Sequence, residues 1–172
     1  MTLQENISIA HETNETGPIP YPWLHRFAIL VCLLTLPLIF LGGQVKSHDA
    51  GLAVPDWPMT FDQNPITFPV SDWVGGIFHE HFHRIVAGII ATMTLILAAW
   101  LAIRKPRPGL HALGFLAVGA VLAQALLGGI TVLLYLPVWA SSAHAILAQT
   151  YFIILVAIVY FMSAEWGRRC AR

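Results

Sequence analysis

The chain has 172 residues, of which 57% are hydrophobic and only 10% are charged, and its mean hydropathy is +0.70. So apolar a composition excludes a soluble domain of this length and predicts an all-α integral membrane protein. The formal net charge is zero. Because the basic residues are few and most of them lie in loops, nothing in the sequence predicts binding to nucleic acid.

The N-terminal residues differ from the rest of the chain. Residues 1–20 are polar, slightly acidic and end in prolines. They lack the basic start and apolar centre of a signal peptide. We therefore expect a disordered N-terminal tail over residues 1–22.

Four apolar runs follow, and each reaches the roughly 20 residues that a helix needs to cross a bilayer. The predicted spanning helices cover residues 23–43, 78–103, 110–136 and 140–162. Together they predict one four-helix transmembrane bundle over residues 23–163, followed by a basic cytoplasmic tail at 164–172.

The placement of lysine and arginine predicts the orientation, because short loops rich in these residues stay in the cytoplasm. Basic residues follow the second and fourth helices, at Arg104, Lys105, Arg107, Arg168, Arg169 and Arg172, whereas only Lys46 lies between the first two. Both termini are therefore predicted to be cytoplasmic in a bacterial-type cell (inner) membrane, with a long first extracytoplasmic loop at 44–77. The tryptophans agree: Trp23, Trp100 and Trp166 fall at the inner interface, and Trp57, Trp73 and Trp139 at the outer one.

An unusual cluster of ionisable residues opens the second helix. Such residues are costly in a membrane helix and usually face a partner, a cofactor or a water-filled cavity. Helical spacing places Glu80, His83 and Arg84 on one face. His79 and His81 are expected nearer the surface, at the interface, and not as ligands.

A second histidine, His144, lies in the fourth apolar run. At about 1.5 Å per residue, His83 and His144 enter their helices to nearly the same depth. Two imidazoles at one level in a bundle can bind a haem iron from both sides. The alternative is that each histidine hydrogen-bonds to a neighbouring helix. With Glu80 and Arg84 beside the pair, we favour haem.

Neighbouring residues bear on this choice. Gly128 and Gly129 remove side chains where a flat macrocycle could approach the third helix, although small residues also serve helix contacts. Arg84 would pair with haem propionates or with Glu80. His25 and His111, near the inner ends of their helices, are candidates for a second haem, but they lack comparable polar companions.

The long loop at 44–77 is rich in apolar residues and proline. Loops of this length in compact domains are usually lids, binding surfaces or disordered segments. Pro55, Trp57 and Pro58 argue against disorder. We expect the loop to cap the cofactor pocket, because it lies on the same side as His83 and His144.

Three segments in order resemble the haem A synthases of cytochrome oxidase assembly. LGGQVKSHDAGLAVPDWP at 41–58 is similar to the family's glycine pair and Pro-Asp-Trp-Pro motif. Glu80, His83 and Arg84 match its Glu-x-x-His-Arg motif. QALLGGITVLL at 124–134, followed by His144, matches its third helix and the histidine that opens the fourth.

This resemblance implies an oxidoreductase that converts the C8 methyl of haem O, through hydroxylated intermediates, to the formyl group of haem A. It also implies bound haem b, with His83 and His144 as axial iron ligands, and activity that requires Glu80. We expect this carboxylate to manage protons or to stabilise positive charge at the methyl carbon. The implied partners are the membrane, haem O and haem A, haem O synthase and cytochrome oxidase subunit I.

The chain departs from the family pattern in three ways. Family members usually have eight helices in two similar halves, so this is a half-length member, and a homodimer or pairing with a second half would restore eight. The outer loop lacks the cysteine pair of some members. An iron with two histidine ligands also has no open position for oxygen.

Two other functions therefore stay open. One is a non-catalytic haem-binding or assembly protein of the oxidase pathway. The other is a four-helix cytochrome b electron-transfer subunit, which would need a second haem. A short internal echo, LGGQV before His83 and LGGITV before His144, is consistent with duplication.

Overall fold

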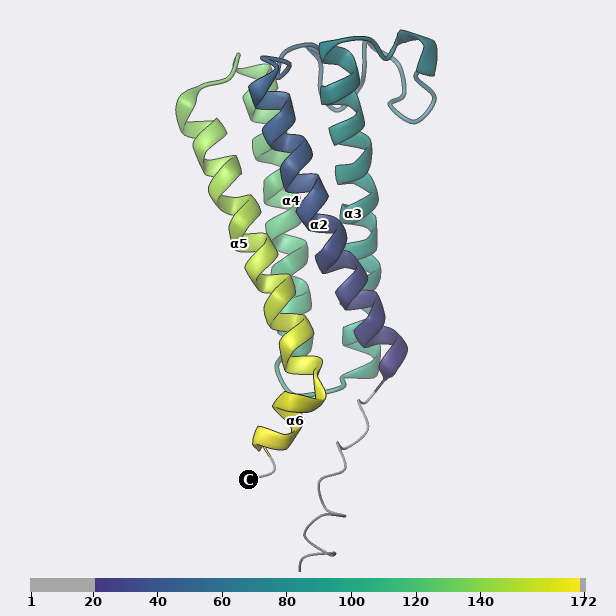
Figure 1. Ribbon diagram of the computed structural model, residues 1–172, viewed down its shortest axis with the longest axis vertical. Helices are drawn as coiled ribbons and strands as arrows, with labels where there is room; N and C mark the ends of the chain where they lie inside the picture. Colours follow the sequence, from purple (N-terminus) through teal and green to yellow (C-terminus); the bar gives the residue numbers. More distant parts are fainter. Residues whose placement is uncertain (1–20, 171–172) are drawn as a thin grey trace, which may run out of the picture.

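The computed structural model describes residues 21–170, and four long helices dominate them (Figure 1). They are α2 (Pro22–Ser47), α3 (Gly76–Arg104), α4 (Leu110–Leu133) and α5 (Val138–Met162). All four are long and apolar enough to cross a membrane.

The described residues contain no strand beyond one isolated bridge. The predicted all-α, multi-pass membrane bundle is confirmed. Most of the predicted N-terminal tail lies outside the described residues.

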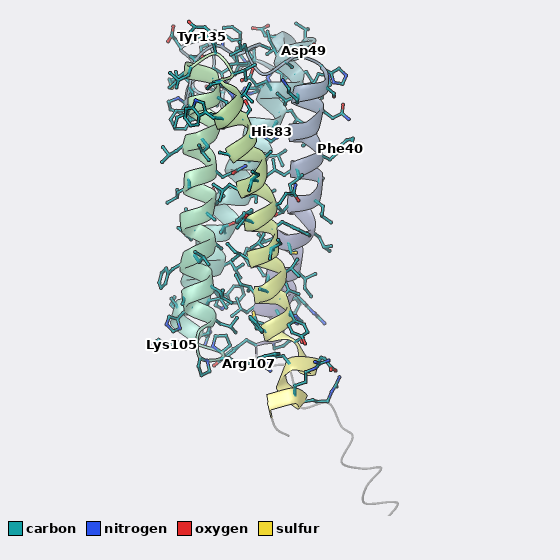
Figure 2. All side chains as sticks on the ribbon, turned by 90° about the vertical axis from the view of Figure 1, so that its left-hand side faces the viewer. Phe40, Asp49, His83, Lys105, Arg107 and Tyr135 are labelled. Atoms are coloured by element: carbon teal, nitrogen blue, oxygen red, sulfur yellow. The ribbon has the colours of Figure 1, made fainter. Side chains whose placement is uncertain are left out.

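The helices form a ring in which α2 packs on α3, α3 on α4, α4 on α5, and α5 on α2. Helices α3 and α5 are therefore diagonal partners. Leu24, Leu97, Leu101, Leu155 and Ile158 are fully buried between the helices. Many outward-facing apolar side chains, such as Phe40 in Figure 2, remain exposed and are suited to contact lipid.

The two ends of the bundle differ (Figures 1 and 2). One end carries the connection between α2 and α3 and the turn between α4 and α5, and we call it the loop end. The opposite end carries Lys105 and Arg107, and we call it the basic end. There, Arg107 donates hydrogen bonds to the carbonyls of Phe161, at 2.6 Å, and Ser163, at 3.3 Å. These bonds satisfy carbonyls where α5 ends.

Residues after α5 form a further element. The tail predicted at 164–172 contains the short helix α6 (Ala164–Cys170). In it, Glu165 accepts hydrogen bonds from Arg168 and Arg169. These pairs, three and four residues apart, are the spacings that stabilise one helical turn.

Both α2 and α4 end at the loop end in the same backbone motif. In α2, Asp49 has φ 50°, and Ala50 N donates to Val45 O at 2.9 Å. In α4, Tyr135 has φ 57°, and Leu136 N donates to Thr131 O at 2.7 Å. This is the Schellman pattern, in which a left-handed residue closes the helix. It explains why α4 stops three residues before the predicted end at Leu136, whereas α2 runs four residues past Gly43.

The connection at 48–75 folds over the loop end and contains one short 3₁₀ helix, η1 (Val70–Asp72). Thr60 and Gln63 exchange two backbone hydrogen bonds of 3.0 Å each. Val54, Thr60 and Phe68 are buried against the bundle. The segment is therefore a packed cover and not a loose linker.

Candidate functional site

The two candidate ligands lie at one level near the loop end. His83 follows the start of α3 at Gly76 by seven residues, and His144 follows the start of α5 at Val138 by six. At about 1.5 Å per residue their depths agree to within about 2 Å. Both rings are half-buried. Figure 2 shows His83 in the part of the bundle nearest the loop end.

Each histidine ring packs against a glycine of the preceding helix. A methyl group added at Gly42 would lie 3.2 Å from His83 Cε1, and one added at Gly128 would lie 3.2 Å from His144 Cε1. Such a distance is tighter than ordinary van der Waals contact. Each imidazole therefore occupies a place that only glycine leaves open. At Gly128 the ring that approaches the backbone is His144 itself, where we expected a macrocycle.

The hydrogen bonds of the ring nitrogens show which nitrogen of each histidine is available to bind a metal. His144 Nδ1 shares a 3.1 Å hydrogen bond with the Gln124 carbonyl, and Gln124 Nε2 donates back to the His144 carbonyl at 2.9 Å. His83 Nδ1 is buried without a partner. Within the described chain, Nε2 of neither ring takes part in a hydrogen bond. A backbone acceptor on one nitrogen is the usual second partner of a metal-bound imidazole.

These observations fit a haem. The two imidazoles lie at one level on different helices with Nε2 free of hydrogen bonds, and each ring packs on a glycine. The alternative, a histidine that only bonds a neighbouring helix, describes His144 Nδ1 but leaves both Nε2 atoms unexplained. Residues His83 and His144 would hold the iron, and the group would supply redox chemistry.

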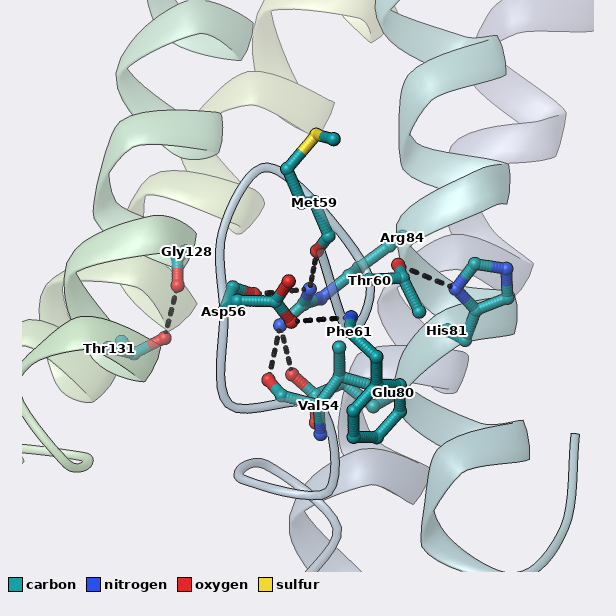
Figure 3. A network of polar contacts seen from close by, with 10 residues as sticks. All are labelled: Val54, Asp56, Met59, Thr60, Phe61, Glu80, His81, Arg84, Gly128 and Thr131. Carbon is teal, nitrogen blue, oxygen red and sulfur yellow. Dashed lines mark hydrogen bonds and ion pairs between the residues drawn. The ribbon is translucent and has the colours of Figure 1, made fainter. Parts of the chain in front are cut away.

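Glu80 and Arg84 form a buried ion pair that contacts the loop (Figure 3). Glu80 is only 3% exposed. Its Oε1 accepts from Arg84 Nη2, and its Oε2 accepts from Val54 N at 2.8 Å. Both carboxylate oxygens are thus engaged, one by the next turn of α3 and one by the loop backbone.

Arg84 binds the loop even more extensively. Its Nη2 donates to Val54 O at 2.9 Å, and its Nη1 donates to Asp56 O at 2.8 Å and Met59 O at 3.2 Å. With the bond to Glu80, these contacts use the four N–H groups of the two terminal nitrogens. Of the two partners expected for Arg84, the structure brings Glu80 to it, together with three loop carbonyls.

Asp56 stabilises the next turn of the same segment. Its carboxylate accepts hydrogen bonds from Phe61 N at 2.9 Å and Asp62 N at 2.8 Å. Partial burial acts to raise the pKa of Asp56, but the N–H donors of Asp62 and Phe61 and the nearby Arg84 charge outweigh it. The pKa of Asp56 therefore lies below its usual value.

Trp57, at the centre of this segment, contacts helix α4. A methyl group added at Gly129 would lie 2.6 to 2.8 Å from three carbons of the Trp57 ring system. The indole therefore lies directly against the backbone of α4. Gly129, the second glycine of the Gly128–Gly129 pair, thus packs against a tryptophan from the loop, a contact that no local pattern in the sequence predicts.

His81 is buried, contrary to the expectation that it lies near the surface. It has no exposed area, it shares a 3.1 Å hydrogen bond with Thr60 Oγ1, and the rings of Phe68 and Trp73 pack around it. The loop folds over the start of α3 and covers this residue. His79 is half-buried and stacks on His48 at the loop end, with ring centroids 4.1 Å apart.

The candidates for a second haem are not brought together. His25 Nε2 bonds to the Val159 carbonyl at 3.1 Å and so ties α2 to α5. His111 is exposed at the start of α4. One of the two histidines is therefore already used in helix packing, and the other faces outward.

Comparisons with known proteins identify the family of this chain. Residues 21–157 match the model of the family described as cytochrome oxidase assembly protein. Curated relatives called "Heme A synthase" include one from Methylorubrum populi, 34% identical over 84% of this chain and 39% of its own length. One from Methylobacterium radiotolerans is 32% identical over 73% of this chain and 36% of its own length. One from Beijerinckia indica is 28% identical over 94% and 47%.

This chain thus spans between about a third and a half of the length of those curated relatives. No solved structure matches it. The family match covers α2, α3 and α4 and reaches well into α5, so it contains every residue of the site described above. The chain belongs to the cytochrome oxidase assembly protein family.

Proposed function

We propose that the chain binds haem between His83 and His144 and acts in the conversion of haem O to haem A for cytochrome oxidase. The observation that carries the proposal is the pair of imidazoles at one level, each on a glycine and each with Nε2 free. Family membership and relatives called "Heme A synthase" support the same assignment.

The proposed reaction oxidises the C8 methyl of haem O to a formyl group, with water supplying the oxygen atom and an electron acceptor outside this chain taking the electrons. Haem b, when bound, would supply one-electron redox chemistry. Glu80 is the proposed catalytic carboxylate. Arg84 and Val54 N hold it in place. An oriented carboxylate can accept a proton or stabilise positive charge that develops at the substrate carbon.

We further propose that the loop end faces the extracytoplasmic side, following the distribution of lysine and arginine. His83 and His144 would both be engaged in holding the iron of one haem. Oxidation of haem O therefore calls for a second haem site, supplied by a homodimer or by a second half. The alternative function is that the chain carries haem for oxidase assembly without oxidising it.

A haem extract separates these functions. The chain is expressed in a host that makes haem O but no haem A, and membrane haems are separated by chromatography. Haem A that disappears in His83→Ala is the expected result. Bound haem b or haem O without haem A would contradict the synthase function and support the haem-carrier function.

A second experiment tests Glu80. Glu80→Gln should abolish haem A formation and leave the optical spectrum of bound haem b unchanged. Loss of both haem A and the bound-haem spectrum would assign Glu80 a structural role instead.

A further inference from the structure

The loop segment at 54–60 contacts two helices: α3, which carries His83, and α4, on which the ring of His144 packs. On one side, Arg84, the residue after His83, binds the carbonyls of Asp56 and Met59, which flank Trp57. On the other side, the Trp57 indole lies against Gly129 of α4. Figure 3 shows this segment between α3 and α4, with Arg84 on one side and Gly128 on the other.

The contact between Trp57 and Gly129 on α4 is next to the glycine on which the second candidate ligand, His144, packs. Gly128 carries the ring of His144 and Gly129 carries the ring of Trp57, so two consecutive residues hold one aromatic ring each. The Thr131 hydroxyl donates to Gly128 O at 2.6 Å and ties this turn to the next. Any change that moves the indole away from Gly129 therefore acts on the backbone that supports His144.

We propose that Trp57 is a positioning residue of the haem site. Its indole closes the side of the site between α3 and α4 at the loop end. Because the flanking carbonyls are bound to Arg84, the indole also sets the spacing of these two helices and so the approach of His83 to His144. This inference rests on the proposed function in one respect, that the site binds haem.

The same contacts exclude an equivalent role for the first hairpin. A methyl group at Gly43, the second glycine of LGGQV, would meet nothing within 4 Å. Gly129 is thus required for a ring from the loop, whereas Gly43 is not. The contact has two members, Gly129 and the Trp57 indole, and each can be substituted separately or both together.

The test is a double-mutant cycle on purified, haem-loaded chain in detergent, with Trp57→Ala, Gly129→Ala and the pair. The readouts are the rate of haem transfer to excess apomyoglobin and the low-spin electron paramagnetic resonance spectrum. Each single variant should lose haem about tenfold faster or more, the range seen when support for a metal ligand is removed. It should also shift the low-spin signal.

The double variant should behave like Trp57→Ala alone, because without the indole the added methyl meets no ring. Gly128→Ala is the matched control: its methyl meets His144, so its effect should persist in full when Trp57 is absent. Gly119→Ala, on the same helix with nothing within 4 Å, controls for helix α4 itself. Trp57→Phe should give a smaller increase and the same ranking if Trp57→Ala does not accumulate.

Three results would overturn the inference while leaving the proposed function intact. The first is a Trp57→Ala variant whose haem-loss rate stays within about twofold of wild type, the usual scatter of independent sites. The second is full additivity of Trp57→Ala and Gly129→Ala. The third is a lowered unfolding temperature with an unchanged haem spectrum, which would mean that Trp57 only anchors the loop. A wild-type chain that takes up no haem would instead overturn the proposed function.

Discussion

The α2–α3 and α4–α5 hairpins hold their histidines with the same backbone device. In each, a glycine lies five residues before the end of the first helix, at Gly42 and Gly128. Each first helix closes with a left-handed residue in the Schellman pattern. The histidine then follows six or seven residues into the second helix and packs on that glycine. The short sequence echo thus corresponds to a repeated structural unit.

The hairpins differ in everything that involves the loop. The first is joined by residues 48–75 and the second by residues 134–137. Where α3 has Glu80 and Arg84 around its histidine, the corresponding positions of α5 are Ser141 and Ala145. The polar pair therefore occurs only where a long connection needs to be held. This contrast suggests that Glu80 and Arg84 support the loop as well as any chemistry.

Breaking the polar pair should have the largest effect on stability. Arg84→Met leaves the Glu80 carboxylate buried and removes its charged partner, which typically costs about 3 to 5 kcal/mol. The free energy of unfolding in mixed micelles measures this loss. Glu80→Gln combined with Arg84→Met should recover part of it, since no lone charge remains. A loss below about 1 kcal/mol would mean that the pair behaves as an exposed one.

The second glycines should respond in opposite directions. Gly129→Ala forces the Trp57 ring away and should destabilise the chain by about 1 to 3 kcal/mol. Gly43→Ala meets nothing and should be neutral or stabilising by up to about 1 kcal/mol, because alanine favours helix. Thermal unfolding followed by circular dichroism compares them directly. Equal effects would contradict the asymmetry between the hairpins.

The first glycines, in contrast, should respond alike. Gly42→Ala and Gly128→Ala each place a methyl 3.2 Å from a histidine ring carbon, so both rings must shift by a few tenths of an ångström. We expect each to weaken haem retention by a similar factor, about tenfold. Haem-to-protein ratios after gel filtration test this. A large effect at only one glycine would show that the two ligand seats are not equivalent.

The smallest expected effect concerns the acid stability of the loop. Asp56→Asn weakens hydrogen bonds to Phe61 N and Asp62 N and should cost about 1 kcal/mol at neutral pH. Because the pKa of Asp56 is lowered in the folded chain, its contribution is full above the unfolded pKa of about 3.9 and is lost as pH falls through the folded value. Unfolding free energies between neutral and acid pH should converge for the two proteins. A constant difference would assign the effect elsewhere.

Local pattern was sufficient to predict much of this protein. Helix number, the level of His83 and His144, and the pairing of Glu80 with Arg84 follow from hydropathy and from residue spacing along one helix. These features depend on neighbours within one or two turns, or on a bilayer that cuts every helix at the same height. For that reason no knowledge of the packing was needed.

Contacts between distant segments were not predictable in this way. The burial of His81, the seats of the two histidines on Gly42 and Gly128, and the Trp57–Gly129 contact each join residues from different elements. Whether His81 faces lipid, water or the loop depends on where residues 54–75 fold, and no periodicity in α3 encodes that. The sequence alone determined a bundle of four helices with two histidines at one level. The tertiary structure decided which side chains support these histidines and which hold the loop over them, because those contacts depend on packing between distant segments of the chain.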